Sequence, residues 1–234
     1  MTPSVSVVIP VYNEGDSIVA CLDGLCAAIN LPFEILVVYD SLDDTTRPHV
    51  EEYARDDPRV VPTLNTFGRG PARAIRYGIE HASADVAVVT MADGSDDPTQ
   101  VDALARLVQR GVVVAAASRY MPGGSQIGAP FVKSMMSRLA GLSLYWFARV
   151  GTHDATSSFK AYDRAFVKEV GIESDTGFEV AIELVVKARR RRLPVAEIPT
   201  IWLERTTGTS NFKVWAWLPR YLHWYFYAFG SRIT

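Results

Sequence analysis

Acidic side chains follow a predicted strand in the middle of the chain. The apolar run Val86–Thr90 leads directly into a segment with Asp93, Asp96 and Asp97. Carboxylates are hard oxygen ligands, and Mg²⁺ or Mn²⁺ needs only one or two of them when substrate phosphates supply the rest. The segment therefore predicts a divalent-metal site at the end of a strand. Asp97 has an alternative interpretation, as the cap of a helix that opens at Pro98.

Polar groups also follow the first apolar run, Val5–Ile9. The segment after it is Pro10-Val11-Tyr12-Asn13-Glu14, in which we expect Pro10 to end the strand. The alternative is an ordinary strand-to-helix turn with Asn13 as the helix cap.

A second apolar run, Ile35–Val38, is followed by Tyr39-Asp40 and then by Asp43 and Thr45. A carboxylate in such a place can accept hydrogen bonds from the base or ribose of a nucleotide, as in other doubly wound folds. The alternative is that Asp43 or Thr45 only caps the next helix. Two acidic clusters at adjacent strand ends favour a nucleotide site.

The elements that must hold these groups alternate between strand and helix patterns over the first 120 residues. Continuous apolar strands separated by helices predict an α/β fold with a doubly wound, mainly parallel sheet covered on both faces. Ligands of such folds lie beyond the carboxyl ends of the strands. The remaining expected elements are helices at Glu14–Ile29, Thr45–Arg55, Pro71–Ala82 and Pro98–Arg110, and strands at Val60–Thr63 and Val112–Ala117.

The pattern changes after Arg119. A glycine-rich loop precedes an expected helix, Phe131–Val150, on which Lys133 and Ser137 share one polar face. That face is either solvated or receives a phosphate group, and we favour the second interpretation. It lies away from an apolar stripe of Met135, Leu139, Leu142 and Trp146. Further expected elements are strands at Thr156–Tyr162 and Val195–Trp202, a helix at Phe178–Arg191 and a polar loop at Arg205–Lys213.

Composition limits the possible classes of protein. The chain has 234 residues, of which 48% are hydrophobic and 21% charged, as in an ordinary globular protein. A net charge of −2 argues against a nucleic-acid partner. Cys21 and Cys26 are the only cysteines and fit neither a zinc site nor a disulfide scaffold, so we expect a reducing compartment. The oligomeric state stays open.

The three strand-end segments, in this order, resemble the GT-A glycosyltransferases of family 2, which open with V-I-P-x-Y-N-E. Residues 154–162 (DATSSFKAY) resemble the D-x-T-S-G-F-[RK]-A-Y signature of dolichol-phosphate mannose synthases and related polyprenyl-phosphate glycosyltransferases. Residues 205–213 are similar to their R-x-x-G-x-S-[KN] loop. The resemblance covers residues 5–213 and implies a GT-A (Rossmann-like) fold. It further implies an inverting enzyme that moves a hexosyl unit from GDP-mannose or a UDP-sugar to a dolichyl- or undecaprenyl-type polyprenyl phosphate.

The resemblance also implies roles for individual residues. Catalysis would use Asp93, Asp96, Arg119 and Arg205, with Mg²⁺ or Mn²⁺ on Asp93 and Asp96. The nucleotide sugar would contact Pro10, Tyr12, Glu14, Asp40, Gly68, Arg69, Gly70, Asp93, Arg205 and Lys213. The acceptor phosphate would meet Arg119, Lys133, Ser137 and Asp154. Two departures from the pattern, Tyr39-Asp40 in place of two aspartates and a metal motif shifted by one residue, leave the base and the ligand register open.

The implied chemistry agrees with the residue types. A phosphate monoester is largely dianionic at neutral pH because its second pKa is about 6, so it attacks without a general base. Charge stabilisation of the leaving diphosphate then matters most, which suits a site rich in Arg, Lys and metal ligands. The four histidines are interpreted as structural, and His153 is the least clear of them because it adjoins Asp154.

The last part of the chain is unusually aromatic, with 8 of 25 aromatic residues at positions 215–229. Trp and Tyr favour the headgroup level of a bilayer, so we divide the chain into a GT-A domain, 1–213, and an interfacial helix, 214–234. Trp215, Trp217, Trp224 and Tyr225 would lie at that level. We expect no signal peptide and a peripheral position on the cytoplasmic face of a membrane. The alternative is a buried C-terminal helix or an oligomer contact.

Three further questions stay open at this point. The run Arg189–Arg192 complements a helix dipole or attracts anionic lipid. A soluble family 2 transferase with a saccharide or hydroxyl acceptor would need a carboxylate base, for which Asp97 and Asp154 are candidates. Ala92 and Gly94 also permit a non-catalytic sugar-nucleotide-binding subunit with a decayed metal site.

Overall fold

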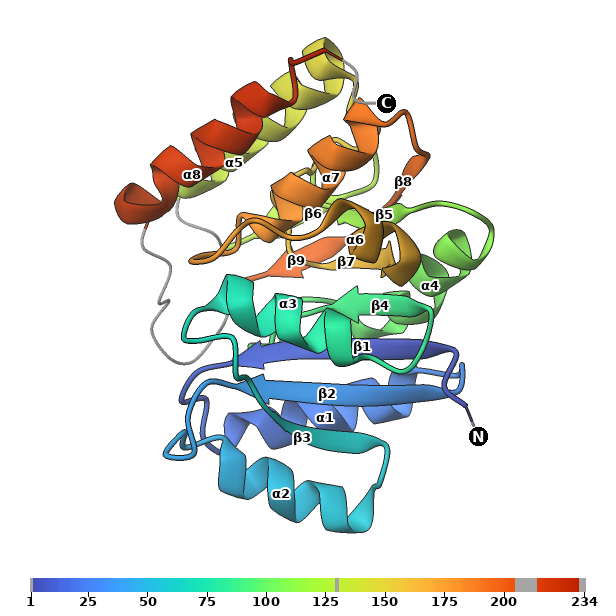
Figure 1. Cartoon of the computed structure of the whole chain (residues 1–234), viewed down its shortest axis with the longest axis vertical. Helices are drawn as coiled ribbons and strands as arrows, with labels where there is room; N and C mark the ends of the chain where they lie inside the picture. Colours follow the sequence, from blue (N-terminus) through green and yellow to red (C-terminus); the bar gives the residue numbers. More distant parts are fainter. Residues whose placement is uncertain (1, 129–130, 205–213, 232–234) are drawn as a thin grey trace.

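The computed structural model describes residues 2–128, 131–204 and 214–231. The larger sheet consists of β1 (Val5–Val11), β2 (Phe33–Tyr39), β3 (Val60–Leu64), β4 (Val86–Val89), β5 (Val114–Ser118), β7 (Lys160–Asp163) and β8 (Val195–Pro199). Its strand order is β3–β2–β1–β4–β7–β5–β8 (Figure 1). All neighbours are parallel except β7, which is antiparallel to both β4 and β5. The predicted α/β class with a mainly parallel sheet is confirmed.

Helices cover both faces of this sheet. One face carries α1 (Ser17–Ala28), α2 (Arg47–Asp56) and α4 (Val101–Gln109), and the other carries α3 (Pro71–His81), α6 (Arg164–Val170) and α7 (Val180–Arg190). Each face has its own apolar core: the first lies under α1, α2 and α4, and the second under α3, α6 and α7. On β1, the side chains of Val5, Val7 and Ile9 belong to the first core, whereas Val8 belongs to the second. Successive side chains of a strand point to opposite faces, so one apolar run supplies both cores.

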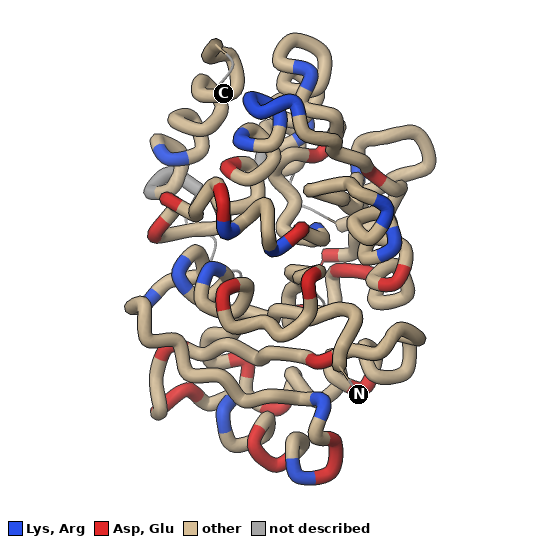
Figure 2. The backbone as a smooth tube through the Cα atoms, turned by 45° about the vertical axis from the view of Figure 1, so that its right-hand side comes forward, with Lys and Arg blue, Asp and Glu red and all other residues tan. Residues whose placement is uncertain are grey.

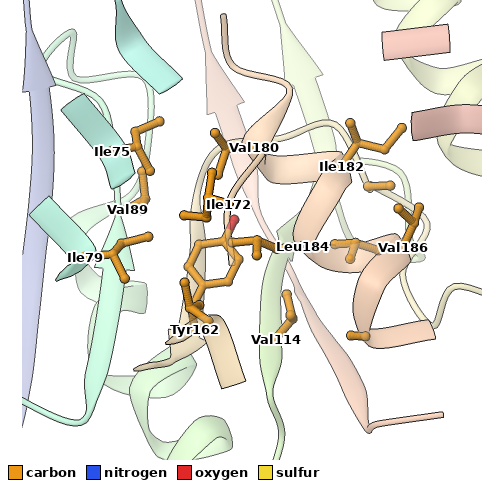
Figure 3. Packing of buried hydrophobic residues seen from close by; sticks show 14 of the residues in the cluster. Ile75, Ile79, Val89, Val114, Tyr162, Ile172, Val180, Ile182, Leu184 and Val186 are labelled. Atoms are coloured by element: carbon orange, nitrogen blue, oxygen red, sulfur yellow. The ribbon is translucent and has the colours of Figure 1, made fainter. Parts of the chain in front are cut away.

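The second core extends from the N-terminal strands to the C-terminal helices. Tyr162 of β7 is 1% exposed and lies between the strands and α7, close to Val114 and Leu184 (Figure 3). Ile75 of α3 and Val186 of α7 belong to the same cluster. The two halves of the sequence therefore share one apolar interior.

Pro10 does not end the first strand, contrary to our prediction. The strand continues to Val11, and Pro10 pairs with Val38 in the parallel register. Proline lacks the backbone N–H that donates to a neighbouring strand, but Pro10 is the last residue but one of β1, so only a hydrogen bond near the end of the strand is lost.

The segment after β5 contains two elements that the sequence pattern did not predict. Within the glycine-rich loop, β6 (Ser125–Ile127) pairs in parallel with β9 (Ile201–Leu203). Helix α5 (Phe131–Ser143) passes into a π-helical turn, η2 (Leu144–Ala148), rather than continuing to Val150. The helix ends there because Arg149 adopts a left-handed backbone, with φ of 55°.

The C-terminal helix α8 (Val214–Tyr227) packs against α7 and lies beside α5 (Figure 1). Trp224 is 4% exposed, and its Nε1–H donates to Ser174 Oγ at 3.0 Å. Trp217 is 9% exposed. These two tryptophans face the domain rather than a bilayer, which corrects our placement of both at a membrane interface. The outward face of α8 carries Leu222 and Phe226.

In the part of the chain that the structure describes, no helix has both the length and the apolar character that crossing a bilayer requires. The expected interfacial role of residues 214–234 remains a prediction.

Candidate active site

The carboxyl ends of β1, β2, β4 and β5 meet at one edge of the sheet because these strands are parallel. Tyr12, Asp40 and Arg119 directly follow β1, β2 and β5, and Asp93 follows β4 after a short loop. The antiparallel β7 begins at the same edge, so the preceding segment with Asp154 lies there too. The topology therefore brings together predicted site residues that lie far apart in the sequence.

Asp40 fixes the loop that follows β3. One carboxylate oxygen accepts from Asn65 Nδ2 at 2.7 Å and the other from the Gly70 N–H at 2.8 Å. Gly70 has φ of +125°, which requires glycine, and the carbonyl of Gly68 accepts a second hydrogen bond from Asn65 at 2.7 Å. Arg69 is exposed at the tip of this loop. Both carboxylate oxygens of Asp40 accept hydrogen bonds from this loop, so Asp40 holds the loop in place. A contact between Asp40 and a ribose stays a prediction.

A second network joins the ends of β1 and β2. The Asn13 N–H donates to both carboxylate oxygens of Asp44 at 3.2 Å, and the Glu14 N–H donates to Thr46 Oγ1 at 2.9 Å. Asn13 therefore links two strand ends and does not cap α1. Tyr12, beside this network, is 59% exposed and available to a planar ligand.

Asp93 and Asp96 lie on the loop after β4 and are both held by hydrogen bonds from neighbouring residues. The Asp93 carboxylate accepts from Ser95 Oγ at 2.6 Å and from the Ser95 N–H at 3.1 Å. The Asp96 carboxylate accepts from Thr90 Oγ1 at 2.9 Å and from the Met91 N–H at 3.2 Å. Burial raises the pKa of Asp96 to about 6, and the charge of Asp93 adds to this rise. The two carboxylates thus share one electronegative site.

Asp97 does not join them. Its side chain caps the short 3₁₀ turn η1 (Pro98–Gln100) by accepting from the Thr99 N–H at 3.0 Å. Among the described residues, no group of three or more Asp, Glu, His or Cys side chains is arranged to hold a metal ion. Asp93 and Asp96 therefore stay the predicted metal ligands, as a pair.

Arg119 and Asp154 form a buried ion pair at the end of β5. Asp154 Oδ2 lies 2.6 Å from Arg119 Nε and 3.1 Å from the Arg119 N–H, and Oδ1 lies 2.9 Å from Nη2. The side chains are 11% and 0% exposed. Burial alone would raise the pKa of Asp154, but the adjacent guanidinium outweighs it and lowers that pKa. Asp154 is therefore held as a carboxylate.

Ser137 connects α5 to this pair. Its hydroxyl lies 3.3 Å from Arg119 Nη2 and 2.7 Å from Thr156 Oγ1. Ser137 of the polar face therefore points into the domain, whereas Met135 and Leu139 of the apolar stripe are 44% and 61% exposed. This polarity is the reverse of an ordinary amphipathic surface helix.

Lys160 is a second buried cation beneath the same edge. It is 0% exposed, and its ammonium donates to the carbonyls of Ala155 and Ser157. Burial lowers the pKa of Lys160 to about 7, although Asp154 acts in the opposite direction. The lysine therefore titrates near neutral pH in the folded chain.

This shift predicts a pH dependence of stability. The unfolded chain keeps Lys160 protonated up to a pKa near 10.5, whereas the folded chain releases the proton above about 7. The free energy of unfolding should therefore rise with pH above neutrality, by about 2 kcal/mol between pH 7 and pH 9. Urea unfolding of Lys160→Met should lack this rise, and the exposed control Lys168→Met should keep it. An equal slope in all three proteins would contradict the assignment.

Next to Arg119 lies an open cavity of about 660 Å³. Its charged or ionisable lining is cationic or neutral, with Arg119, Arg138 and His153 and no carboxylate among the lining residues that the structure describes. Ser134 and Gln126 supply further hydrogen-bonding groups, and Leu142, Trp146 and Met121 line an apolar part. A cavity of this kind suits an anionic group attached to an apolar chain.

His153 belongs to this cavity, which the sequence interpretation as a structural histidine missed. Its ring Nδ1 lies 2.5 Å from Glu197 Oε1, and the backbone N–H of His153 donates to Glu197 Oε2 at 2.8 Å. Tyr145 stacks on the imidazole with ring centroids 3.6 Å apart. Glu197 lies on β8, far from any motif, and only its proximity to His153 in the fold reveals the pair.

Some predicted residues lie outside the described part of the chain. These are Arg205 and Lys213 and the side chain of Lys133. Their assignment to the leaving diphosphate and to the acceptor phosphate stays a prediction.

The sequence is similar to those of known glycosyltransferases. Residues 6–171 match the profile of glycosyl transferase family 2. The chain is 30% identical to the polyprenol monophosphomannose synthase of Mycolicibacterium smegmatis, covering 88% of this chain and 80% of that protein. It is 29% identical to the dolichol-phosphate mannosyltransferase of Pyrococcus furiosus, covering 89% of this chain but only 59% of that longer protein.

Solved structures share the fold at lower identity. A mannosyltransferase from Pyrobaculum calidifontis in complex with GDP-mannose and Mn²⁺ has a TM-score of 0.65 and 19% identity, covering 97% of this chain and 64% of that one. Glucosyl-3-phosphoglycerate synthase from Mycobacterium tuberculosis with Mn²⁺ and UDP has a TM-score of 0.69 and 17% identity, covering 99% and 80%. The expected GT-A fold is thereby confirmed.

Proposed function

Because the chain belongs to glycosyl transferase family 2, and is therefore a glycosyltransferase, we propose that it transfers one hexosyl unit from a nucleotide sugar to a polyprenyl phosphate with inversion. The matched relatives are named for transfer of mannose to polyprenyl-type lipids, which supports GDP-mannose as the first donor to test. A UDP-sugar is the alternative donor.

The observation that carries this proposal is the arginine-containing lining of the open cavity next to Arg119, which is called the acceptor cavity from here on. Arg119, Arg138 and His153 line it together with apolar side chains. Arg119 and His153 are each paired with a carboxylate, Asp154 and Glu197, that does not itself belong to the described lining. A phosphate monoester is already a nucleophile at neutral pH and needs positioning rather than a base. A sugar or alcohol acceptor would need a base to take its proton.

The two candidate bases are unsuited to that task. Asp154 is bound by the Arg119 guanidinium, which lowers its pKa, and Asp97 caps η1 through the Thr99 N–H. The structure thus favours a phosphate acceptor over the soluble hydroxyl-directed transferase.

Asp93 and Asp96 fit a divalent cation in the chemistry of their donors. Both are carboxylates on the loop after β4. Burial of Asp96 and repulsion from Asp93 raise the pKa of Asp96, so its charged form is unfavourable without a nearby cation. A bound cation would offset this unfavourable charge. Two protein oxygens with substrate phosphates are an ordinary ligand set for Mg²⁺ or Mn²⁺. Bound there, the ion would neutralise charge on the leaving diphosphate.

The protein's own groups then do the positioning. The exposed Tyr12 and the loop at 68–70, which Asp40 holds, lie where the nucleoside would bind. Asp154 locks the Arg119 Nε and Nη2 atoms, so the guanidinium is oriented before substrate arrives. Arg205 and Lys213 are proposed to neutralise the leaving diphosphate.

The acceptor's lipid chain requires access to a bilayer, and the surface supports this. The outward stripe of α5 and the outward face of α8 are apolar and exposed, including Leu139 at 61% and Phe226 at 67%. Exposed apolar area of this kind favours an interface. We therefore include peripheral membrane association, by residues 214–231 together with α5, in the proposed function.

A transfer screen tests the proposal. Purified full-length protein is incubated with Mn²⁺, with a GDP- or UDP-sugar, and with either a short-chain polyprenyl phosphate or the corresponding polyprenol. We expect product only with the phosphate. Product from the free alcohol or from a water-soluble sugar would instead support the hydroxyl-directed transferase, and no turnover with any pair would support a binding subunit.

The acceptor assignment of Lys133 gives a sharper prediction. Lys133→Ala should raise the KM for polyprenyl phosphate by about tenfold to a hundredfold, because a charge-assisted contact contributes about 1.5–3 kcal/mol. The KM for the nucleotide sugar should change little. Lys168→Met is the control, because Lys168 is an exposed residue on α6. Equal losses for the two substrates would contradict an acceptor role.

A further inference from the structure

Three arginines line a second open cavity, of about 260 Å³, at the C-terminal end of α7. They are Arg149, which follows η2, and Arg189 and Arg192 from the basic run that ends the helix. The remaining lining is Val150, Gly151, Leu193 and Val195, and no residue is shared with the acceptor cavity. This second cavity is here called the arginine cavity.

The four arginines of the run differ in their partners. Arg190 lies 4.1 Å over the ring of Tyr227, and Arg191 lies 3.8 Å from the carboxylate of Glu169. Arg189 donates to the carbonyl of Ala148, through Nε at 2.6 Å. Within the described ranges, no carboxylate forms an ion pair with any of the three arginines of the cavity. The run is therefore not a uniform solvated turn.

The backbone around the cavity is held in an uncommon conformation. Arg149 and Arg192 both have a left-handed backbone, with φ of 55° and 57°. For a residue with a Cβ atom this conformation is unfavourable, and glycine would adopt it without that penalty. The preceding turn η2 is π-helical, a feature frequent at functional sites. These features bring cations from separate elements to one opening.

Exposed aromatic side chains surround the same end of the molecule. Trp146 and Phe147 of η2 are 69% and 77% exposed. Tyr225 of α8 donates to Ser143 Oγ at 3.0 Å, which ties the C-terminal half of α8 to the junction of α5 and η2. Phe226, next to Tyr225, is 67% exposed. Figure 2 shows Lys and Arg positions gathered at this end of the chain, beside the C-terminus.

We propose that the arginine cavity binds the phosphate headgroup of an anionic lipid, while the aromatic side chains beside it enter the headgroup layer of the same bilayer. Guanidinium groups bind phosphate oxygens in a fork geometry, and Trp is suited to the headgroup level. The C-terminal end of α7 carries about half a negative charge, which three guanidinium groups exceed. This site is separate from the transfer centre, and it selects the membrane rather than the acceptor.

Vesicle co-sedimentation of the full-length chain tests the proposal without donor or acceptor. Vesicles of phosphatidylcholine alone are compared with vesicles containing about one third phosphatidylglycerol. The test variant is Arg149→Asn with Arg192→Asn, because asparagine tolerates a left-handed backbone while removing the charge. The charge-matched control is Arg55→Gln with Arg106→Gln, two exposed residues on α2 and α4.

We expect preferential binding to the anionic vesicles and a partition coefficient about 30-fold lower for the test variant, with the control close to wild type. Equal binding of wild type to both vesicle types, or an equal loss in the control, would overturn the proposal. Binding of inorganic phosphate by calorimetry, without binding to anionic vesicles, would assign the cavity to a soluble anion instead. Transfer to a detergent-solubilised acceptor should be unchanged in both variants, which separates this test from that of the proposed function.

Discussion

Replacing Asp96 by asparagine is expected to lower sugar transfer by about 10²–10³-fold while the protein remains folded. The amide still accepts from Thr90 Oγ1 and the Met91 N–H, so the loop after β4 is retained. What is lost is one of the two carboxylates proposed to hold the cation on the diphosphate. Asp93→Asn should have a similar effect.

Stability should change in the opposite direction. Burial raises the pKa of Asp96 to about 6 from 3.8, so the group stabilises the fold when it is protonated, at low pH, and this contribution is lost as pH rises through 6. At pH 8 the charged carboxylate therefore disfavours the metal-free fold. Asp96→Asn should raise the free energy of unfolding by about 1–3 kcal/mol.

Both quantities are measured on the same preparations, by transfer assay over a Mn²⁺ titration and by urea unfolding in EDTA. Asp97→Asn is the matched control, because asparagine caps η1 as well as aspartate does. Near-normal turnover of Asp96→Asn at low Mn²⁺ would show that the ligand assignment is wrong.

The second large effect concerns the ion pair beneath the acceptor cavity. Asp154→Asn leaves the Arg119 guanidinium, 11% exposed, without its counter-charge. Removing one partner of a buried pair costs about 3–5 kcal/mol. We therefore expect the melting temperature to fall by about 6–20 °C for a chain of this size. The KM for the acceptor should rise in the remaining folded protein because Arg119 loses its orientation.

A double-mutant cycle separates the pair from general damage. Arg119→Met in the Asp154→Asn background removes the uncompensated charge, so the double variant should be less destabilised than the sum of the single variants, by about 2 kcal/mol. Asp163→Asn, at the half-buried N-cap of α6, should be close to wild type because asparagine can also cap the helix. A strictly additive cycle would contradict the description of Arg119 and Asp154 as one coupled unit.

The amino-acid sequence was sufficient to predict the fold class and the strand ends at which the acidic segments lie. Apolar runs such as Val5–Ile9 predict buried parallel strands because local β-branched composition reports burial on both faces. The carboxyl-end positions of Asp40, Asp93 and Asp96 then follow, because parallel strands end at one edge. Their resemblance to family 2 motifs pointed to the same edge.

Local patterns could not assign faces at the second half of the chain. The apolar stripe of α5 and the tryptophans of α8 look alike in sequence, yet Leu139 is 61% exposed and Trp224 is 4% exposed. Helical periodicity identifies an apolar face but not what covers it. The position of α7 beside α8 makes that choice, since α7 supplies the apolar surface on which Trp224 packs.

Long-range partners were likewise decided by tertiary structure alone. His153 looked structural because no motif contains it, and Glu197 on β8 is 44 positions away. Arg149 and Arg192 likewise lie far apart in the sequence and share no motif. They line one cavity because η2 and α7 end at the same place. The sequence determined which segments form buried strands and which polar residues follow them, because that depends on local composition. The tertiary structure decided which side chains meet, because a contact depends on the path of the whole chain.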